Sequence, residues 1–368
     1  MVVEGGRWKI AANYDIIIDG CLPPELTLEI LLRLPVKSLL NFKLVCKSWN
    51  SLICSPDFIK SHTRNSNNPS LTLLYDRDFM ELYSLNPTVS QVDLTPQYYP
   101  YSEFIGSCDG LICIYSPRKE CIYILNPLTN ETKKISTPYH EPDRMIRVSW
   151  FGFDPSINDY MIWLVVGIRK RNLRIHVYST KDDNWRELDT SVFIFIDDCM
   201  FWGMNVVVMN ETLHCWLGND YNNFMVKYNL VKDIIEIERI NLNYNQDIKY
   251  SNEPSIGILQ DSSLCLCKVN GINGVMDVWK LDQYSNSDFW NKLFRLDLGL
   301  PKFVTLLGFT SNGRILVKSS SYELVLVDPN QNPPLQVRLG TIDYHNDRCR
   351  SFDLLDYSES LVSPFSLP

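Results

Sequence analysis

A repeat of about 50 residues is the feature of this sequence that most constrains its fold. Five segments join a polar turn to an apolar run, and they read CDGLICIYS, INDYMIWLV, MNETLHCWL, QDSSLCLCK and TSNGRILVK. Their turn residues are 49, 52, 51 and 51 positions apart, at Asp109, Asn158, Asn210, Asp261 and Asn312. Further strand-like runs follow each turn, as IYILNP and KKISTP do after the first. The sequence therefore predicts five copies of one unit with about four strands each.

This period predicts an all-β propeller-like repeat domain in which each unit forms one blade. The strands are continuous apolar runs, which is typical of sheets buried on both faces. A partial copy, ELYSLNP, precedes the first full unit. We expect it to share a closing blade with the C-terminal stretch SFDLLDYSESLV, which gives about six blades of four strands. A stack of β-sandwiches is the alternative, and the single regular period argues against it.

The N-terminal part follows a different pattern, which begins with ELTLEILLRLP at residues 25–35. Its charges, at Glu25, Glu29 and Arg33, are four residues apart and form one narrow polar stripe on an otherwise apolar helix. Prolines bound the segment on both sides and keep it well below the roughly 20 residues that span a bilayer. We therefore expect protein to bury this helix.

A second helical pattern covers residues 38–53, SLLNFKLVCKSWNSLI. The residues at the spacing of one helix face are Phe42, Val45, Cys46, Trp49, Leu52 and Ile53. A unit this small buries little of its own surface. Two apolar faces therefore indicate that one packs within the unit and the other on a partner.

Charge divides unevenly along the chain. Residues 20–64 carry six Lys and Arg against three acidic residues, a local charge of +3, whereas residues 65–368 carry 27 against 37, a net charge of −10. A pI near 5.2 and the lack of a long basic run argue against nucleic acid as a partner. The start MVVEGGRWKI lacks a secretory signal, and no apolar run is long enough for a membrane span. We expect a cytoplasmic and/or nuclear protein with no membrane contact, whose 11 cysteines stay reduced.

Catalytic and metal-binding patterns are weak in this sequence. The five histidines are scattered without metal-ligand spacing, and neither a Gly-rich phosphate loop nor a Gly-x-Ser-x-Gly motif occurs. The pair Cys265 and Cys267 shares one strand face and is interpreted as buried core. We expect no catalytic residue, metal or cofactor. A propeller enzyme that draws its catalytic residues from separate blades is the less favoured alternative.

Residues 22–58, LPPELTLEILLRLPVKSLLNFKLVCKSWNSLICSPDF, resemble the F-box. The matching features are the leading Leu-Pro, the central LPVKSL, the Val-Cys-Lys-x-Trp and the closing Ser-Pro-x-Phe. One departure is Pro24, which stands before Glu25 where the family often has Asp or Glu directly after Leu-Pro. The remainder resembles the plant F-box-associated (FBA type) domain in GSCDGLICIYS, ILNPLTNETKKI, GFDPSINDYMIWLVV and the terminal YSESLVSP. This group includes the S-locus F-box proteins.

The resemblance implies a tail at 1–19, a small all-α F-box domain at 20–62, a propeller-like domain at 70–362 and a tail at 363–368. It implies a non-catalytic, substrate-recognition subunit of a Skp-cullin-F-box ubiquitin ligase, whose F-box binds an acidic Skp-family adaptor. A ligase-independent protein-binding module is the alternative. The residues that would contact the adaptor, shared with the domain's own core, are Leu22, Pro23, Leu26, Ile30, Leu31, Pro35, Val36, Leu39, Val45, Cys46 and Trp49.

Self-comparison of the units predicts where a protein substrate binds. The turns after the first and third strands repeat closely, whereas the other connections differ from unit to unit. Because successive connections alternate between the two ends of a blade, the variable ones share one end of the ring, where loops can differ without disturbing the scaffold. Their basic and aromatic residues are candidates for binding an acidic substrate surface. These are Arg169, Lys170, Arg171, Arg174, Phe201, Trp202, Tyr221, Tyr244 and Tyr250.

Overall fold

A computed structural model of the chain describes residues 2–4, 7–10, 14–16, 23–65, 71–76, 81–85, 90–92, 102–139, 144–168, 171–191, 206–218, 223–240, 254–282, 289–300, 304–341 and 352–367. Near the N-terminus, β1 (Val2–Glu4), β2 (Arg7–Ile10) and β3 (Tyr14–Ile16) form one antiparallel sheet, where the sequence predicts a tail. Residues 23–65, the helical unit, then form α1 (Pro24–Leu32), α2 (Val36–Phe42), α3 (Lys47–Ile53) and α4 (Pro56–Asn65). No helix in the described ranges is long and apolar enough to cross a membrane.

Proline and serine set the limits of these helices. Pro24 is the first residue of α1, where its missing N–H leaves no hydrogen bond unmade, and Pro35 directly precedes α2. The backbone N–H of Phe58 donates to Ser55 Oγ at 3.3 Å, which caps the start of α4. The expected continuous helix over residues 38–53 is wrong, because the chain turns at residues 43–46 between α2 and α3.

The turn has a clear packing reason. Cys46 is extended, with φ −156° and ψ 162°, so the helix is interrupted there and α3 starts as a separate element that contacts α2. Leu39 of α2 and both Leu52 and Ile53 of α3 can then enter the same core. One straight helix would carry these residues more than two turns apart, since each turn advances about 5.4 Å.

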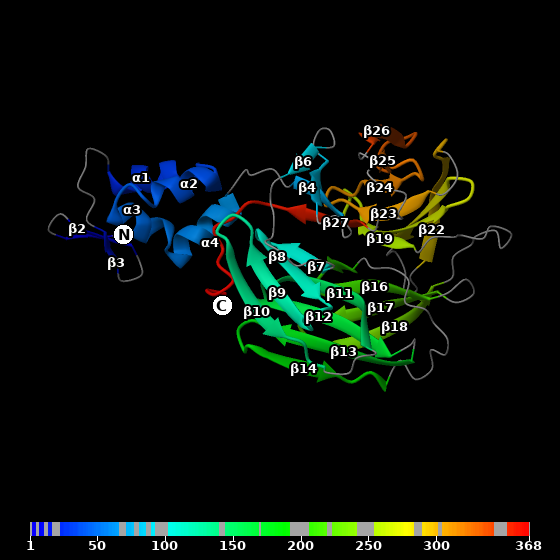
Figure 1. Cartoon of the computed structure of the whole chain (residues 1–368), viewed down its shortest axis with the longest axis horizontal. Coiled ribbons are helices and arrows are strands. Elements are labelled where there is room, and N and C mark those ends of the chain that lie inside the picture. Colours follow the sequence, from blue (N-terminus) through cyan, green and yellow to red (C-terminus); the bar gives the residue numbers. More distant parts are fainter. Residues whose placement is uncertain are drawn as a thin grey trace.

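Six four-stranded antiparallel sheets follow, and each is one blade of a ring (Figure 1). Blade 1 holds β7 (Glu103–Cys108), β8 (Leu111–Ser116), β9 (Cys121–Asn126) and β10 (Glu131–Ser136), and blade 2 holds β11 (Arg144–Asp154), β12 (Asp159–Ile168), β13 (Arg171–Ser179) and β14 (Asn184–Leu188). Blade 3 holds β15 (Val206–Met209), β16 (Thr212–Gly218), β17 (Asn223–Asn229) and β18 (Ile234–Ile240). Blade 4 holds β19 (Ser255–Ile258), β20 (Leu264–Asn270), β21 (Val275–Asp282) and β22 (Phe289–Asp297). Blade 5 holds β23 (Thr305–Phe309), β24 (Ile315–Lys318), β25 (Glu323–Asp328) and β26 (Leu335–Thr341).

Blade 6 closes the ring with strands from both ends of the domain. Its order is β27 (Phe352–Tyr357), β4 (Leu71–Asp76), β5 (Glu81–Ser84) and β6 (Ser90–Val92). β27 pairs with β4 from Phe352 opposite Asp76 to Tyr357 opposite Leu71. The first strands of all six blades meet around the centre, and β27 contacts both β23 and β7. The predicted six-bladed propeller, with ELYSLNP and SFDLLDYSESLV in the closing blade, is therefore confirmed.

The core of the ring lies between neighbouring blades. Six clusters of buried side chains each join two adjacent blades, and the large side chains of Trp163, Trp279 and Tyr228 in them are almost fully shielded from water. Every residue of β8, β9 and β20 is buried, as expected for strands covered on both faces. The outer strand β10 has only one buried residue, Ile135. The apolar runs of the sequence are thus the middle strands of each blade.

Candidate functional site

The helical unit divides its apolar residues between a core and an exposed surface. The core contains Leu31, Val36, Leu39, Leu52, Ile53 and Phe58, all nearly inaccessible to water. On α1, Leu26 and Ile30 are 47% and 49% exposed, and because they lie four residues apart they share one face. In the connection between α2 and α3, Leu44 is 87% exposed and Val45 is 62% exposed. We call Leu26, Ile30, Leu44 and Val45 the exposed apolar set.

The structure sorts the predicted adaptor contacts into these two groups. Three of them, Leu31, Val36 and Leu39, lie in the core of the helical unit. Trp49 is half-buried, with its ring centroid 5.3 Å from that of Phe42. Leu22 lies outside the described residues. The exposed ones are Pro23, Leu26, Ile30, Pro35, Val45 and Cys46.

Sequence reasoning missed Leu44, the most exposed large apolar side chain in the described ranges. The expected continuous helix placed Leu44 off the apolar face and left it without a role. The chain turns there instead, so Leu44 and Val45 project together from a short connection. The consecutive residues Leu44, Val45 and Cys46, which fit no single helix face, were the available signal.

Cys46 follows these two residues, and the pKa of its thiol is shifted. Its Sγ lies 3.1 Å from the Ser48 hydroxyl oxygen, at the start of α3. This hydrogen bond, together with one to the backbone of Trp49, lowers the pKa of Cys46 below the ordinary thiol value. The thiol is exposed to solvent. Cys46 is therefore a chemical probe of this surface.

The two ends of the propeller differ in their connections. At one end, which we call the repetitive end, lie the turns between the first and second strands and between the third and fourth. Residues at the same position in these turns share a left-handed backbone, with φ 49° at Asp109, 51° at Asn158 and 49° at Asn210. Asn and Asp tolerate this conformation better than most residues, which explains the repeated turn sequences. The other end, the variable end, carries the connections that differ between blades.

The helical unit packs on the repetitive end beside blade 1. Leu128, in the turn between β9 and β10, and Leu361, beyond β27, both join the core of the helical unit. Lys37 of α2 forms an ion pair with Glu359, with Nζ and Oε1 3.3 Å apart. Figure 1 shows the helices to one side of the ring and the C-terminal segment running from β27 toward them. The helical unit and the variable end therefore lie at opposite ends of the ring.

Most predicted substrate-binding residues fall outside the described ranges. Arg174 is described, on β13, and it is exposed, but both oxygens of Glu187 accept hydrogen bonds from its guanidinium at 3.1 and 3.2 Å. Its charge is thus partly balanced within blade 2. Arg171 begins β13 at the variable end, and only its backbone is described. Those outside the described residues are Arg169, Lys170, Phe201, Trp202, Tyr221, Tyr244 and Tyr250.

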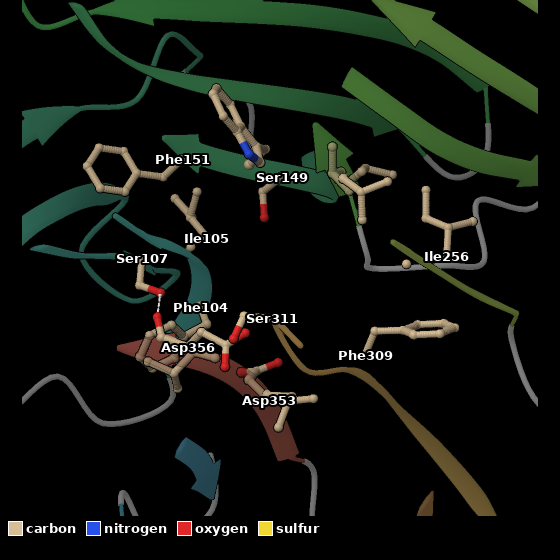
Figure 2. Close-up of a pocket in the computed structure, with 18 of the residues that line it drawn as sticks. Phe104, Ile105, Ser107, Ser149, Phe151, Ile256, Phe309, Ser311, Asp353 and Asp356 are labelled. Carbon is tan, nitrogen blue, oxygen red and sulfur yellow. Dashed lines mark hydrogen bonds between the residues drawn. The ribbon is translucent and has the colours of Figure 1, made fainter. Parts of the chain in front are cut away.

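A cavity of about 410 Å³ occupies the centre of the ring and is lined by the first strand of every blade. Its walls mix apolar and polar groups, and Figure 2 shows the side chains of Ser149, Ser311 and Asp353 turned toward this space. Asp356 accepts a hydrogen bond from Thr72 Oγ1 at 3.0 Å, and burial raises the pKa of its carboxyl group. No group of three or more His, Cys, Asp or Glu in the described ranges could hold a metal ion. Sequence reasoning missed this cavity, although the lining strands of blades 1 to 5 immediately precede the repeated turns.

Both regions of the chain are similar to known families. Residues 20–61 match the F-box domain family, and residues 81–364 match the family described as F-box associated beta propeller domain. Among curated relatives from Arabidopsis thaliana, F-box/kelch-repeat protein At3g23880 is 26% identical over 80% of this chain and 84% of its own length. F-box protein CPR1 is also 26% identical, over 84% of this chain and 80% of its own.

A solved structure shares the fold at much lower identity. The one titled "Crystal structure of Nidogen/Laminin Complex" contains a chain that is 12% identical to this one, with a TM-score of 0.50. The match covers 79% of this chain and 100% of that chain. This likeness concerns the architecture of the ring alone.

Proposed function

Because the chain belongs to the F-box proteins that carry an F-box associated β-propeller domain, we propose that it is the substrate-recognition subunit of a Skp-cullin-F-box ubiquitin ligase. The helical unit, an F-box, binds a Skp-family adaptor, and the propeller binds a protein that is then ubiquitinated. The chain itself catalyses no step of this transfer. The observation that carries the proposal is the exposed apolar set on an F-box packed at one end of the ring.

The exposed apolar set supplies the energy for adaptor binding. Burying apolar surface contributes about 25 cal/mol per Å², and large apolar side chains at the centre of an interface dominate its affinity. The local charge of +3 around these residues favours an acidic partner and speeds its approach. Leu31, Val36 and Leu39 support the same surface from beneath, because they hold α1 and α2 in place.

The substrate surface in this proposal is the variable end of the propeller. The F-box packs on the opposite end, so an adaptor and a substrate can bind together without sharing a face. Basic and aromatic residues in the variable connections select a partner with an acidic surface. We place this activity in the cytoplasm or nucleus.

Co-purification and titration with a recombinant Skp-family adaptor test the proposal. Leu44→Asp should weaken adaptor binding by about 100-fold or more, because a charge would be buried without a partner in the interface. Ile157→Asp is the matched control, since Ile157 is also an exposed apolar residue, 44% accessible, but lies in a blade 2 turn. The control should bind like the wild type. If the wild type binds no Skp-family adaptor, the chain is instead a ligase-independent binding module.

A further inference from the structure

The chain beyond β27 is bound tightly to the repetitive end of blade 1. The Ser360 hydroxyl donates a hydrogen bond to the carbonyl oxygen of Asp109, in the turn between β7 and β8. The side-chain amide of Asn126, at the end of β9, donates to the carbonyl oxygens of Ser360 and Val362, at 3.0 and 2.8 Å. Ser360 is fully buried. Residues 358–362 thus lie across two turns of blade 1.

The blade 1 turn is shaped for this close approach. Gly110 has φ +76°, and a Cβ atom built there would lie 2.7 Å from the carbonyl oxygen of Ser358 and in collision with the Ser360 side chain. A side chain at this position would force the segment away from the turn. The absence of a Cβ therefore lets residues 358–360 lie directly against the backbone of blade 1.

The same segment also reaches into the F-box. Leu361 is buried in the core formed by Leu31, Val36 and Leu39, and Leu128 of blade 1 packs beside it. Glu359 pairs with Lys37 of α2. A residue from the end of the chain therefore completes the hydrophobic core of a domain at its beginning. Successive residues of this short segment thus contact the two domains in alternation, Glu359 and Leu361 the F-box and Ser360 and Val362 blade 1.

Blade 1 differs from blade 3 at the matching position. Asn126 and Asn229 both end a third strand, and each uses its side-chain oxygen to accept a backbone N–H of the following turn, from Leu128 at 2.9 Å and from Lys232 at 2.7 Å. The Asn229 amide donates to Thr212 within its own blade, at 3.4 Å. Only the Asn126 amide of this pair bridges to the C-terminal segment.

We propose that residues 358–362 form a brace that holds the F-box against blade 1 in a single orientation. The brace joins the two domains by hydrogen bonds on one side and by the buried Leu361 on the other. The brace therefore fixes the position of the adaptor surface relative to the variable end, a consequence that rests on the proposed function. A flexibly tethered F-box would present a bound substrate over a range of positions instead.

Asn126→Asp tests the brace in the full-length chain. The substitution keeps an oxygen to cap the turn but replaces two donors with a carboxylate oxygen that faces carbonyl oxygens. Asn229→Asp is the matched control, because it makes the same change at the same repeat position without touching the segment. Hydrogen exchange of amides in α1 and α2 is measured together with the maximum dimension from small-angle X-ray scattering.

Asn126→Asp should speed exchange in α1 and α2 by about tenfold or more, the effect of losing two hydrogen bonds that hold this unit in place. It should also lengthen the molecule, whereas Asn229→Asp should change neither quantity. Equal behaviour of the two variants, or faster exchange spread over the propeller instead of the F-box, would overturn the proposal.

A truncation after Tyr357 provides a second test, because it keeps β27 and removes the whole brace. Wild-type dimensions and wild-type exchange in α1 for this truncation would also overturn the proposal. Neither measurement needs an adaptor. Failure of adaptor binding, which would remove the proposed function, therefore leaves the test of the brace intact.

Discussion

The propeller and the F-box bury their apolar side chains to different extents. In the propeller every core lies between two sheets, so that Trp163 and Trp279 are shielded from water. In the F-box, four short helices take Leu361 from the far end of the chain into their core and still leave Ile30 and Leu44 exposed. A unit of this size cannot surround all of its apolar residues. The ring is therefore stable through its own packing, whereas the F-box depends on contacts with neighbouring segments.

The largest expected effect is at the interface between blades 3 and 4. Trp279→Ala should lower the free energy of unfolding by about 3–5 kcal/mol, because it leaves a large cavity in a core that cannot collapse. Trp185→Ala is the control, since Trp185 lies half-buried on the outer strand β14 and should cost less. Denaturant unfolding followed by circular dichroism measures both. Equal losses would contradict the view that the ring's stability lies in its inter-blade cores.

A second prediction compares neighbouring residues of α1. Leu31→Ala should destabilise the F-box by about 2–4 kcal/mol, because Leu31 is 1% exposed in the core. Ile30→Ala should change stability by less than about 1 kcal/mol yet weaken adaptor binding, because Ile30 is half-exposed. Hydrogen exchange of the helices and adaptor titration separate the two effects. If Ile30→Ala unfolds the F-box, then α1 does not divide into a core face and an adaptor face.

The smallest expected effect is chemical. A lowered pKa raises the fraction of Cys46 present as thiolate at neutral pH, and the thiolate is the form that reacts with iodoacetamide. Burial instead raises the pKa of Cys215 to about 12, so that this thiol in the propeller should not react in the folded chain. Mass spectrometry after brief labelling at pH 7 should find Cys46 modified first, and bound adaptor should protect it. Faster labelling of the exposed Cys54 would contradict the lowered pKa of Cys46, and a lack of protection would place the adaptor surface elsewhere.

Much of the fold could be predicted from the sequence because the repeat is local. Each turn around Asp109, Asn158 or Asn210 specifies its own left-handed backbone, so the spacing of the units predicted the blades. The closing blade was also predictable, since the partial copy and the C-terminal stretch each lacked strands that the other supplied. The helix expected over residues 38–53 was wrong because apolar spacing alone cannot show that Leu39, Leu52 and Ile53 share one core.

The candidate sites were less predictable because exposure is a property of the packed molecule. Sequence pattern marked Leu26, Ile30 and Leu31 equally, and only the position of the other helices makes Leu31 core and Ile30 surface. The central cavity needed the ring to close before its lining strands could face one another. The substrate end stays a prediction drawn from the variable connections.

By itself, the sequence determined the order of the two domains, the five full repeat units and the placement of repetitive turns at one end, because each follows from spacing within about 50 residues. Only the tertiary structure decided which F-box residues are exposed and how the F-box is attached. Leu361 and Leu31 are separated by nearly the whole chain, and Asn126 contacts Ser360 in a segment that directly follows β27, the strand that pairs with β4. Contacts of that range depend on ring closure, which brings the two ends of the chain together at the repetitive end of blade 1.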